Sequence, residues 1–67
     1  MKLHVNSSDI LVPGTVKSVG DLLEHLKLNQ KAAIVELNAA ILEKSQHAET
    51  ELAEGDRIEI VHFVGGG

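Results

Sequence analysis

Cysteine, tyrosine and tryptophan are absent from the 67 residues, and the chain has one phenylalanine and one proline. Without cysteine there are no disulfides, thiolate metal ligands or cysteine nucleophiles. No apolar run approaches the roughly 20 residues that cross a bilayer, and no signal peptide is expected, so we predict a cytoplasmic protein without membrane contact. A chain this short builds a thin core and leaves little room for a deep catalytic pocket. These absences favour a partner-dependent module over an enzyme.

Positive charge is also scarce. Six lysine and arginine residues against ten acidic residues give a net charge of −4 at pH 7, which argues against nucleic acid or anionic membranes as partners. Residues 1–35 carry four lysines and three acids, whereas residues 36–67 carry two basic side chains and seven acids. We therefore expect a partner that docks on the second half to be basic there.

In a chain that has no cysteine, histidine is the first residue type to consider as a metal ligand. The histidines are His4, His25, His47 and His62. No pair has the i, i+4 helical spacing or the short His-x-His spacing of a binding site. We expect no metal site, and we interpret His62 as a packed residue at the edge of the sheet.

Five segments have the apolar pattern of β-strands. They are residues 2–6, 10–12, 33–37, 40–42 and 57–63. Ser7-Ser8-Asp9 is the predicted turn between the first two strands. Asn38-Ala39 lacks the glycine that a two-residue turn prefers, so we expect either four or five strands.

One segment has the pattern of a helix. Val19, Leu22, Leu23 and Leu26 lie at i, i+3, i+4 and i+7, which predicts a short helix over residues 19–27. Ser18 and Asp21 approximate a capping box at its start, and Asn29 could close it in a left-handed conformation. The order of elements predicts an α+β domain over residues 1–63, with one helix across one face of a mixed sheet.

The last predicted strand leads into Val64-Gly65-Gly66-Gly67, which we interpret as a flexible tail over residues 64–67. Glycine has no Cβ, so such a tail can enter channels that exclude other residues. At about 3.3–3.6 Å per extended residue, four residues reach about 13–14 Å, which places a carboxylate inside another protein's active site. The alternative is a frayed end that does nothing.

Three stretches resemble a known family. They are Met1-Lys2-Leu3-His4-Val5-Asn6, then Thr15-Val16 leading to Asp21-Leu22-Leu23, then Glu54-Gly55-Asp56 and the strand that runs into Gly65-Gly66-Gly67. With them the chain resembles the ThiS family, sulfur carriers of thiamine biosynthesis with a ubiquitin-like β-grasp fold. The closing glycines alone would be shared with other β-grasp carriers and with ubiquitin. Asn38-Ala39 departs from the Asn-Gly usual in the family.

The resemblance implies a sulfur cycle carried at Gly67. A ThiF-like enzyme would adenylate its carboxylate with ATP, and sulfur from a cysteine desulfurase would then displace AMP and leave a thiocarboxylate. Thiazole synthase, ThiG, would take that sulfur, and Gly65 and Gly66 would let the end reach each active site. The chain would hold no catalytic residue and no cofactor of its own. It would be a protein cosubstrate, monomeric when free.

The resemblance also predicts a docking surface. In a β-grasp sheet the strands over residues 33–37 and 57–63 are neighbours, so Ile34, Val61 and Phe63 would form one outward-facing apolar patch beside the tail. The alternative is that single exposed apolar residues need no partner.

Three other functions remain open. The small subunit of molybdopterin synthase would have the same fold, tail and chemistry with a different acceptor. A ubiquitin-like modifier would instead be joined to lysines of target proteins, and a plain β-grasp binding module would not use its tail. The short length and the His-Phe-Val-Gly-Gly-Gly ending favour the thiamine branch.

Overall fold

A five-stranded sheet forms the body of the protein, in the order β2-β1-β5-β3-β4. The computed structural model describes residues 1–62, so Phe63 and the predicted tail over residues 64–67 lie outside the described residues. The strands are β1 Lys2–Val5, β2 Ser8–Leu11, β3 Ala33–Leu37, β4 Ala40–Leu42 and β5 Arg57–His62. The helices are α1 Val19–His25 and two 3-10 helices, η1 Gln30–Ala32 and η2 Lys44–Gln46.

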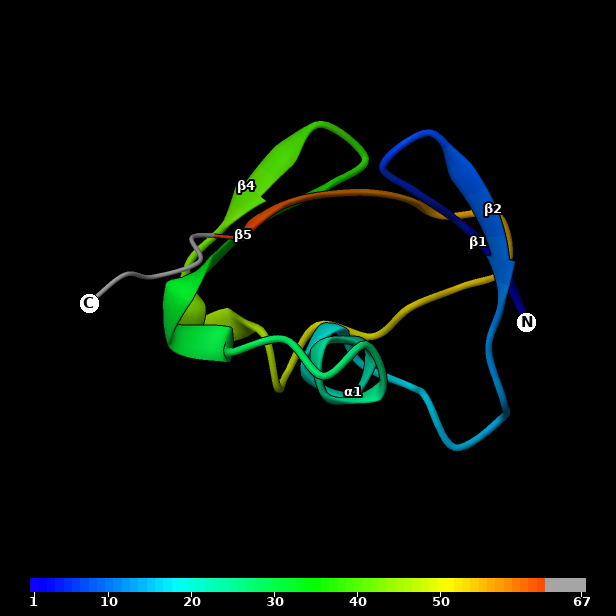
Figure 1. Ribbon diagram of the computed structural model, residues 1–67, viewed down its shortest axis with the longest axis horizontal. Coiled ribbons are helices and arrows are strands. Elements are labelled where there is room, and N and C mark those ends of the chain that lie inside the picture. The colour runs from blue at the N-terminus through cyan, green and yellow to red at the C-terminus, as the bar shows by residue number, and fades with distance from the viewer. Residues whose placement is uncertain (63–67) are drawn as a thin grey trace.

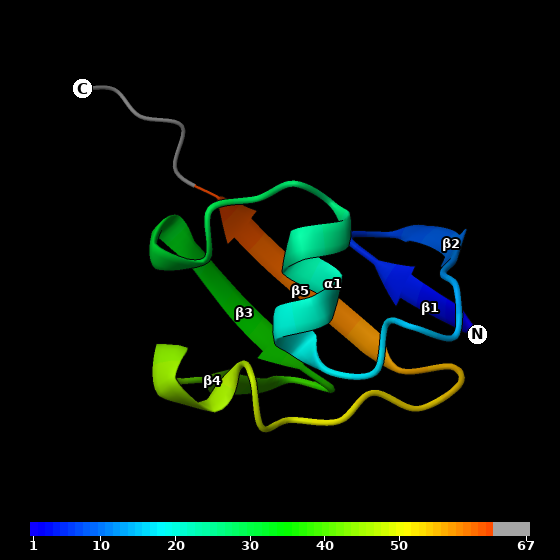
Figure 2. The same ribbon diagram turned by 90° about the horizontal axis from the view of Figure 1, so that it is seen from below.

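α1 crosses one face of this sheet, as Figures 1 and 2 show from two directions. Leu22 and Leu23 of the helix share one core with Leu3, Val35 and Ile58 of the strands, and all five side chains are fully buried. β1 runs parallel to β5, whereas β3 runs antiparallel to it, so the sheet is mixed. The predicted α+β fold, with one helix on one face of a mixed sheet, is confirmed, and the sheet has five strands.

The two ends of α1 explain its length. The predicted capping box is present: Ser18 Oγ accepts from the Asp21 N–H at 3.1 Å, and the Asp21 carboxylate accepts from the Ser18 N–H at 3.1 Å. The helix is two residues shorter than predicted because Lys27 takes the left-handed conformation, with φ of 59°, and donates its N–H to the Glu24 carbonyl at 3.0 Å. Asn29, which was expected to close the helix, instead caps η1.

Two turns without glycine close the two hairpins. Asn6 and Ser7 have φ of 48° and 72°, and Asn38 and Ala39 have φ of 49° and 73°. Positive φ at both central residues is what a type I′ turn requires, and asparagine tolerates it better than most residues. The first turn therefore begins one residue before the predicted Ser7-Ser8-Asp9. The second allows β4 to form although Ala39 stands where a glycine is preferred.

The asparagine of each turn also bonds to the backbone of β5. β1 pairs with β5 at two positions and then turns away. Beyond that point the Asn6 amide takes its place: its Oδ1 accepts from the Ile60 N–H at 2.7 Å, and its Nδ2 donates to the Ile60 carbonyl at 3.0 Å. Asn38 Oδ1 accepts from the Arg57 N–H at 3.0 Å at the other end of the strand. β5 is thus held laterally by side chains where strand pairing ends.

We predict that Asn6→Ala lowers the free energy of unfolding by about 1–3 kcal/mol, because it leaves the part-buried N–H and carbonyl of Ile60 without their protein partner. Ser7→Ala is the matched control, since Ser7 has a similar positive φ but its side chain is not part of the amide contact with Ile60. It should cost no more than about 0.5 kcal/mol. Urea unfolding measures both values, and equal losses would contradict the proposed role of the amide.

Candidate functional site

The candidate site lies where the central strand ends. β5 has neighbours on both sides and runs to His62, which pairs with Ala33 of β3. His62 Nε2 accepts from the Asn29 N–H at 3.4 Å, so the ring contacts the connection between α1 and β3. The prediction that His62 lies at the edge of the sheet was wrong, because β5 is central. Phe63, predicted for the docking patch, and the predicted functional glycines, Gly65, Gly66 and Gly67, lie outside the described residues.

Three apolar side chains gather on the uncovered face of the sheet near this end. Ile34 and Val61 are direct cross-strand partners on β3 and β5, with 41% and 54% of their surfaces exposed. Ile41 on β4, 71% exposed, pairs with Glu36 and lies on the same face. We call Ile34, Ile41 and Val61 the apolar patch. The sequence prediction did not include Ile41. In the structure its neighbour Leu42 is half-buried, and because successive strand residues point to opposite faces, Ile41 points outward.

The other half of this face is polar. A hollow of about 270 Å³ is lined by His4, Ser7, Asp9, Arg57 and Glu59. His4 Nδ1 contacts the Asp9 carboxylate, and their side chains are 38% and 56% exposed, so water screens the pair. Beyond the hollow, Leu11 is 79% exposed on the edge strand β2. The apolar patch is therefore confined to the half of the sheet nearest the end of β5.

The described residues also bear on two other kinds of feature, a metal site and a membrane-spanning helix. Within residues 1–62, no group of three or more histidine, aspartate or glutamate side chains could hold a metal ion. None of the helices in this described part of the chain is both long enough and apolar enough to span a bilayer.

Two titratable groups have shifted pKa values for different reasons. The backbone N–H groups of Lys17 and Ser18 hold the pKa of Asp21 below its usual value, because both donate to the ionised carboxylate. Burial lowers the pKa of His47, and the positive charge of Lys44 lowers it further. The His47 side chain is 1% exposed, and neither ring nitrogen has a hydrogen-bond partner among the described residues. The Asp21 carboxylate caps α1, whereas the His47 ring is a buried polar group without a partner among the described residues, and neither group faces the apolar patch.

His47 is buried because the segment after η2 packs closely against the start of α1. The Gly20 N–H donates to the His47 carbonyl at 2.8 Å, and the Val19 N–H donates to the Thr50 carbonyl at 2.9 Å. A Cβ at residue 20 would stand 3.4 Å from the Cα of Ala48, which is an ordinary contact distance, so these backbone bonds set the approach without requiring glycine. The loop between β4 and β5 thereby pairs backbone donors that a helix start leaves without partners.

Known proteins match both the sequence and the fold. The ThiS family model matches residues 3–67. The sulfur carrier protein ThiS of Bacillus subtilis is 43% identical over 65 residues, which cover 97% of this chain and 98% of that protein. The chain belongs to the ThiS family. The resemblance noted in the sequence is thereby confirmed.

Two further proteins are similar to this chain, one of them over its whole fold and the other over part of its own length. The crystal structure of ThiS from Geobacter metallireducens superposes with a TM-score of 0.82 at 38% identity, over the full length of both chains. A thiazole synthase from Paramagnetospirillum magneticum is 36% identical over 67 residues, which span all of this chain but 20% of that protein. A stretch similar to ThiS is therefore part of a longer protein that is named as a thiazole synthase.

We predict that the stability of this protein falls as pH drops from 7.5 to 5.5. The folded-state pKa of His47 lies below the ordinary value of 6.5, so the unfolded chain takes up the proton first, and acid favours unfolding. His47→Leu removes that proton uptake, whereas His4, His25 and His62 remain in both proteins. Urea unfolding across this range should therefore give a smaller loss of stability for His47→Leu. Parallel pH profiles would contradict the assignment.

Proposed function

We propose that this chain is a sulfur carrier whose Gly67 carboxylate is adenylated, converted to a thiocarboxylate and used as the sulfur source for thiazole formation in thiamine biosynthesis. The observation that carries the proposal is the similarity, over nearly the whole chain, to a protein named as a sulfur carrier. The match of the ThiS family model extends through residue 67 and so includes the glycines on which the chemistry depends.

Each step of the cycle has a chemical reason. A free carboxylate is a poor electrophile, so a ThiF-like enzyme first joins it to AMP: a carboxylate oxygen attacks the α-phosphorus of ATP, and pyrophosphate leaves. A persulfide sulfur derived from a cysteine desulfurase then attacks the acyl carbon, and AMP leaves. A thiol of the sulfur-transfer machinery next attacks the outer sulfur of the resulting acyl disulfide, so that the S–S bond breaks, a new disulfide forms between the two thiols and the thiocarboxylate is released. Gly67 leaves that carbon open because it has no side chain, and Gly65 and Gly66 fit a narrow channel. ATP is consumed by the partner, and the carrier binds no cofactor.

The carrier is a cosubstrate in this scheme, not an enzyme. No side chain of the chain acts as acid, base or nucleophile, so lowering the reaction barriers is left to the activating enzyme and to thiazole synthase. Such a role suits a short chain with a thin core. ATP and the desulfurase are cytoplasmic resources, so we place the carrier in the cytoplasm.

Thiazole synthase, ThiG, is the proposed acceptor of the sulfur. The support is the ThiS-like stretch within a longer protein named as a thiazole synthase, since such a protein carries a carrier-like segment and a synthase on one chain.

The apolar patch is the proposed docking surface for these enzymes. Ile34 and Val61 adjoin the end of β5, and Ile41 extends the patch onto β4, so a partner that takes up the following residues must approach this part of the sheet. Binding energy usually concentrates on side chains that become buried at the centre of an interface, and exposed apolar residues are suited to that role. Phe63 was predicted for the same patch and stays a prediction.

Intact-mass spectrometry tests the carrier function. After incubation with ATP, the ThiF-like enzyme and a sulfur source, we expect the mass of the chain to rise by the difference between one sulfur and one oxygen. A chain without Gly67 should keep its mass, because its new end is displaced from the active site. An unchanged wild-type mass with an enzyme active on its own carrier would contradict the proposal, and covalent linkage to protein lysines would indicate a modifier.

The docking role of the patch is tested by Val61→Ser. We expect the KM of the ThiF-like enzyme for the carrier to rise about tenfold with kcat nearly unchanged, since the lost contact is made equally in ground and transition states. Leu11→Ser is the control, because Leu11 is also an exposed apolar strand residue but lies at the opposite edge. Equal effects of the two substitutions on KM would contradict docking at the patch.

A further inference from the structure

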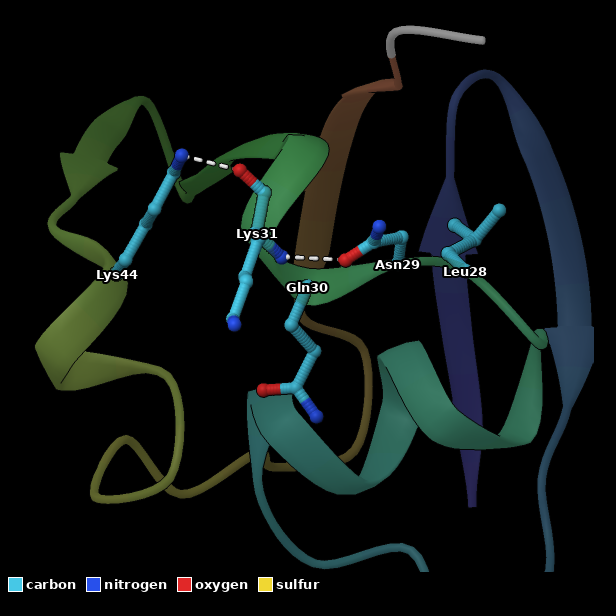
Figure 3. A pocket seen from close by; sticks show the side chains of 5 residues that line it. All are labelled: Leu28, Asn29, Gln30, Lys31 and Lys44. Atoms are coloured by element: carbon cyan, nitrogen blue, oxygen red, sulfur yellow. Dashed lines mark hydrogen bonds between the residues drawn. The ribbon is translucent and has the colours of Figure 1, made fainter. Parts of the chain in front are cut away.

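A second surface feature lies beside the end of β5. A cleft of about 460 Å³ is lined by Leu28, Asn29, Gln30, Lys31 and Lys44, as Figure 3 shows. The first four belong to the connection after α1 and to η1, and Lys44 begins η2. We call it the cationic cleft, because Lys31 and Lys44 are its charged residues. It is separate from the apolar patch, whose side chains stand on the uncovered face of the sheet.

Hydrogen bonds fix the backbone of Lys31 and the side chain of Lys44. Asn29 Oδ1 accepts from the Lys31 N–H at 2.9 Å, which fixes the first turn of η1. The Lys44 ammonium donates to the Lys31 carbonyl oxygen, and Figure 3 shows the Lys44 side chain extended toward it. Two residues that are 13 positions apart in the sequence thus share one wall of the cleft.

The charge of this cleft is opposite to that of the chain as a whole. The net charge is −4, yet no acidic residue occurs between Glu24 and Glu36. Both Lys31 and Lys44 are exposed, and within residues 1–62 no carboxylate forms an ion pair with either ammonium. The negative charge of the chain as a whole repels an acidic group on a partner, whereas the cationic cleft attracts it. The cleft therefore favours one orientation of the bound partner.

The cleft adjoins the segment on which the proposed chemistry depends. The Asn29 N–H donates to the ring of His62, which is the last described residue of β5. A protein that accepts the residues after His62 therefore brings its own surface next to Asn29 and the two lysines. The charges of Lys31 and Lys44 then act at short range on charged groups of the bound partner.

We propose that the cationic cleft binds carboxylate side chains on the rim of the adenylating enzyme's channel, and so sets the angle at which the chain end enters. This inference rests on the proposed carrier function. Lys31 and Lys44 act as positioning residues: their contacts with the partner are made before the reaction and stay unchanged during it, so they lower KM and leave kcat alone.

Charge reversal of Lys31 tests this proposal in ATP–pyrophosphate exchange by the ThiF-like enzyme, with the carrier as variable substrate. Lys31→Glu should raise the KM for the carrier about threefold to tenfold at low salt, with kcat nearly unchanged. Lys17→Glu is the matched control, because Lys17 is also an exposed lysine, its replacement changes the net charge equally, and it lies before the opposite end of α1. Its effect on KM should stay below about twofold.

Two further measurements separate a local charge effect from other causes. Lys44→Gln, which removes one charge without reversing it, should raise KM by a smaller factor than Lys31→Glu. High salt should bring the KM values of wild type and Lys31→Glu together, because screening weakens both attraction and repulsion. Circular dichroism and thermal unfolding confirm that each variant is folded.

Equal KM shifts for Lys31→Glu and Lys17→Glu would overturn the proposal, as would a shift that high salt does not reduce. Failure of the carrier function looks different, because wild-type carrier would then support no exchange at all. A phosphate ligand is distinguished by titrating the free chain with ATP or inorganic phosphate. We expect no saturable change in the amide resonances of Lys31 and Lys44, and such a change would overturn recognition of carboxylates in favour of phosphate.

Discussion

The lateral hydrogen bonding of β5 is the constraint on which the rest of the structure depends. This strand is central, so its neighbours on both sides must satisfy its backbone, yet β1 turns away after two paired positions. The Asn6 amide bonds to both polar groups of Ile60 and extends the pairing by one residue. Ile58 and Ile60 can therefore face α1 while the strand continues to His62. The site lies where this support ends.

Two surfaces of different chemistry border that end. The apolar patch stands on the uncovered face of the sheet, and the cationic cleft lies beside the connection that contacts His62. Apolar burial contributes affinity without fixing direction, whereas a local positive charge on an acidic chain favours one orientation. A partner that uses both surfaces binds the carrier in one arrangement. The same arrangement suits a chain whose own residues supply no catalytic group.

Patterns of short range made most of the fold predictable. The period of two over β5 and the helical spacing of Val19, Leu22 and Leu23 identified a strand and the helix, and Ser18 with Asp21 located the helix start. Apolar periodicity could not indicate the end of α1, because Lys27 adopts positive φ against its intrinsic preference and the backbone bonds of the turn stabilise it. Nor could it place His62, since strand order depends on pairing between distant segments.

Parts of the site could be predicted from residue type and strand alternation alone. Other parts depend on tertiary packing and could not be predicted from the sequence. The glycines at residues 65–67 indicated a carrier only together with the two other stretches that resemble the ThiS family, and alternation assigned Ile34 and Val61 to the uncovered face. Lys31 and Lys44 were ordinary surface lysines in the sequence, because η1 and η2 bring them together only in the folded chain. The Asn6 amide was hidden for the same reason, since its partner Ile60 lies 54 positions away.

Transfer of labelled sulfur from Gly67 tests the central claim most directly. The chain would first be converted to its thiocarboxylate with isotopically labelled sulfur and then incubated with thiazole synthase and its other substrates. If the chain is a sulfur carrier of thiamine biosynthesis, the label appears in the thiazole product and the chain returns to its carboxylate mass. Label that stays on the chain, with a synthase that accepts sulfur from another ThiS protein, would contradict that function.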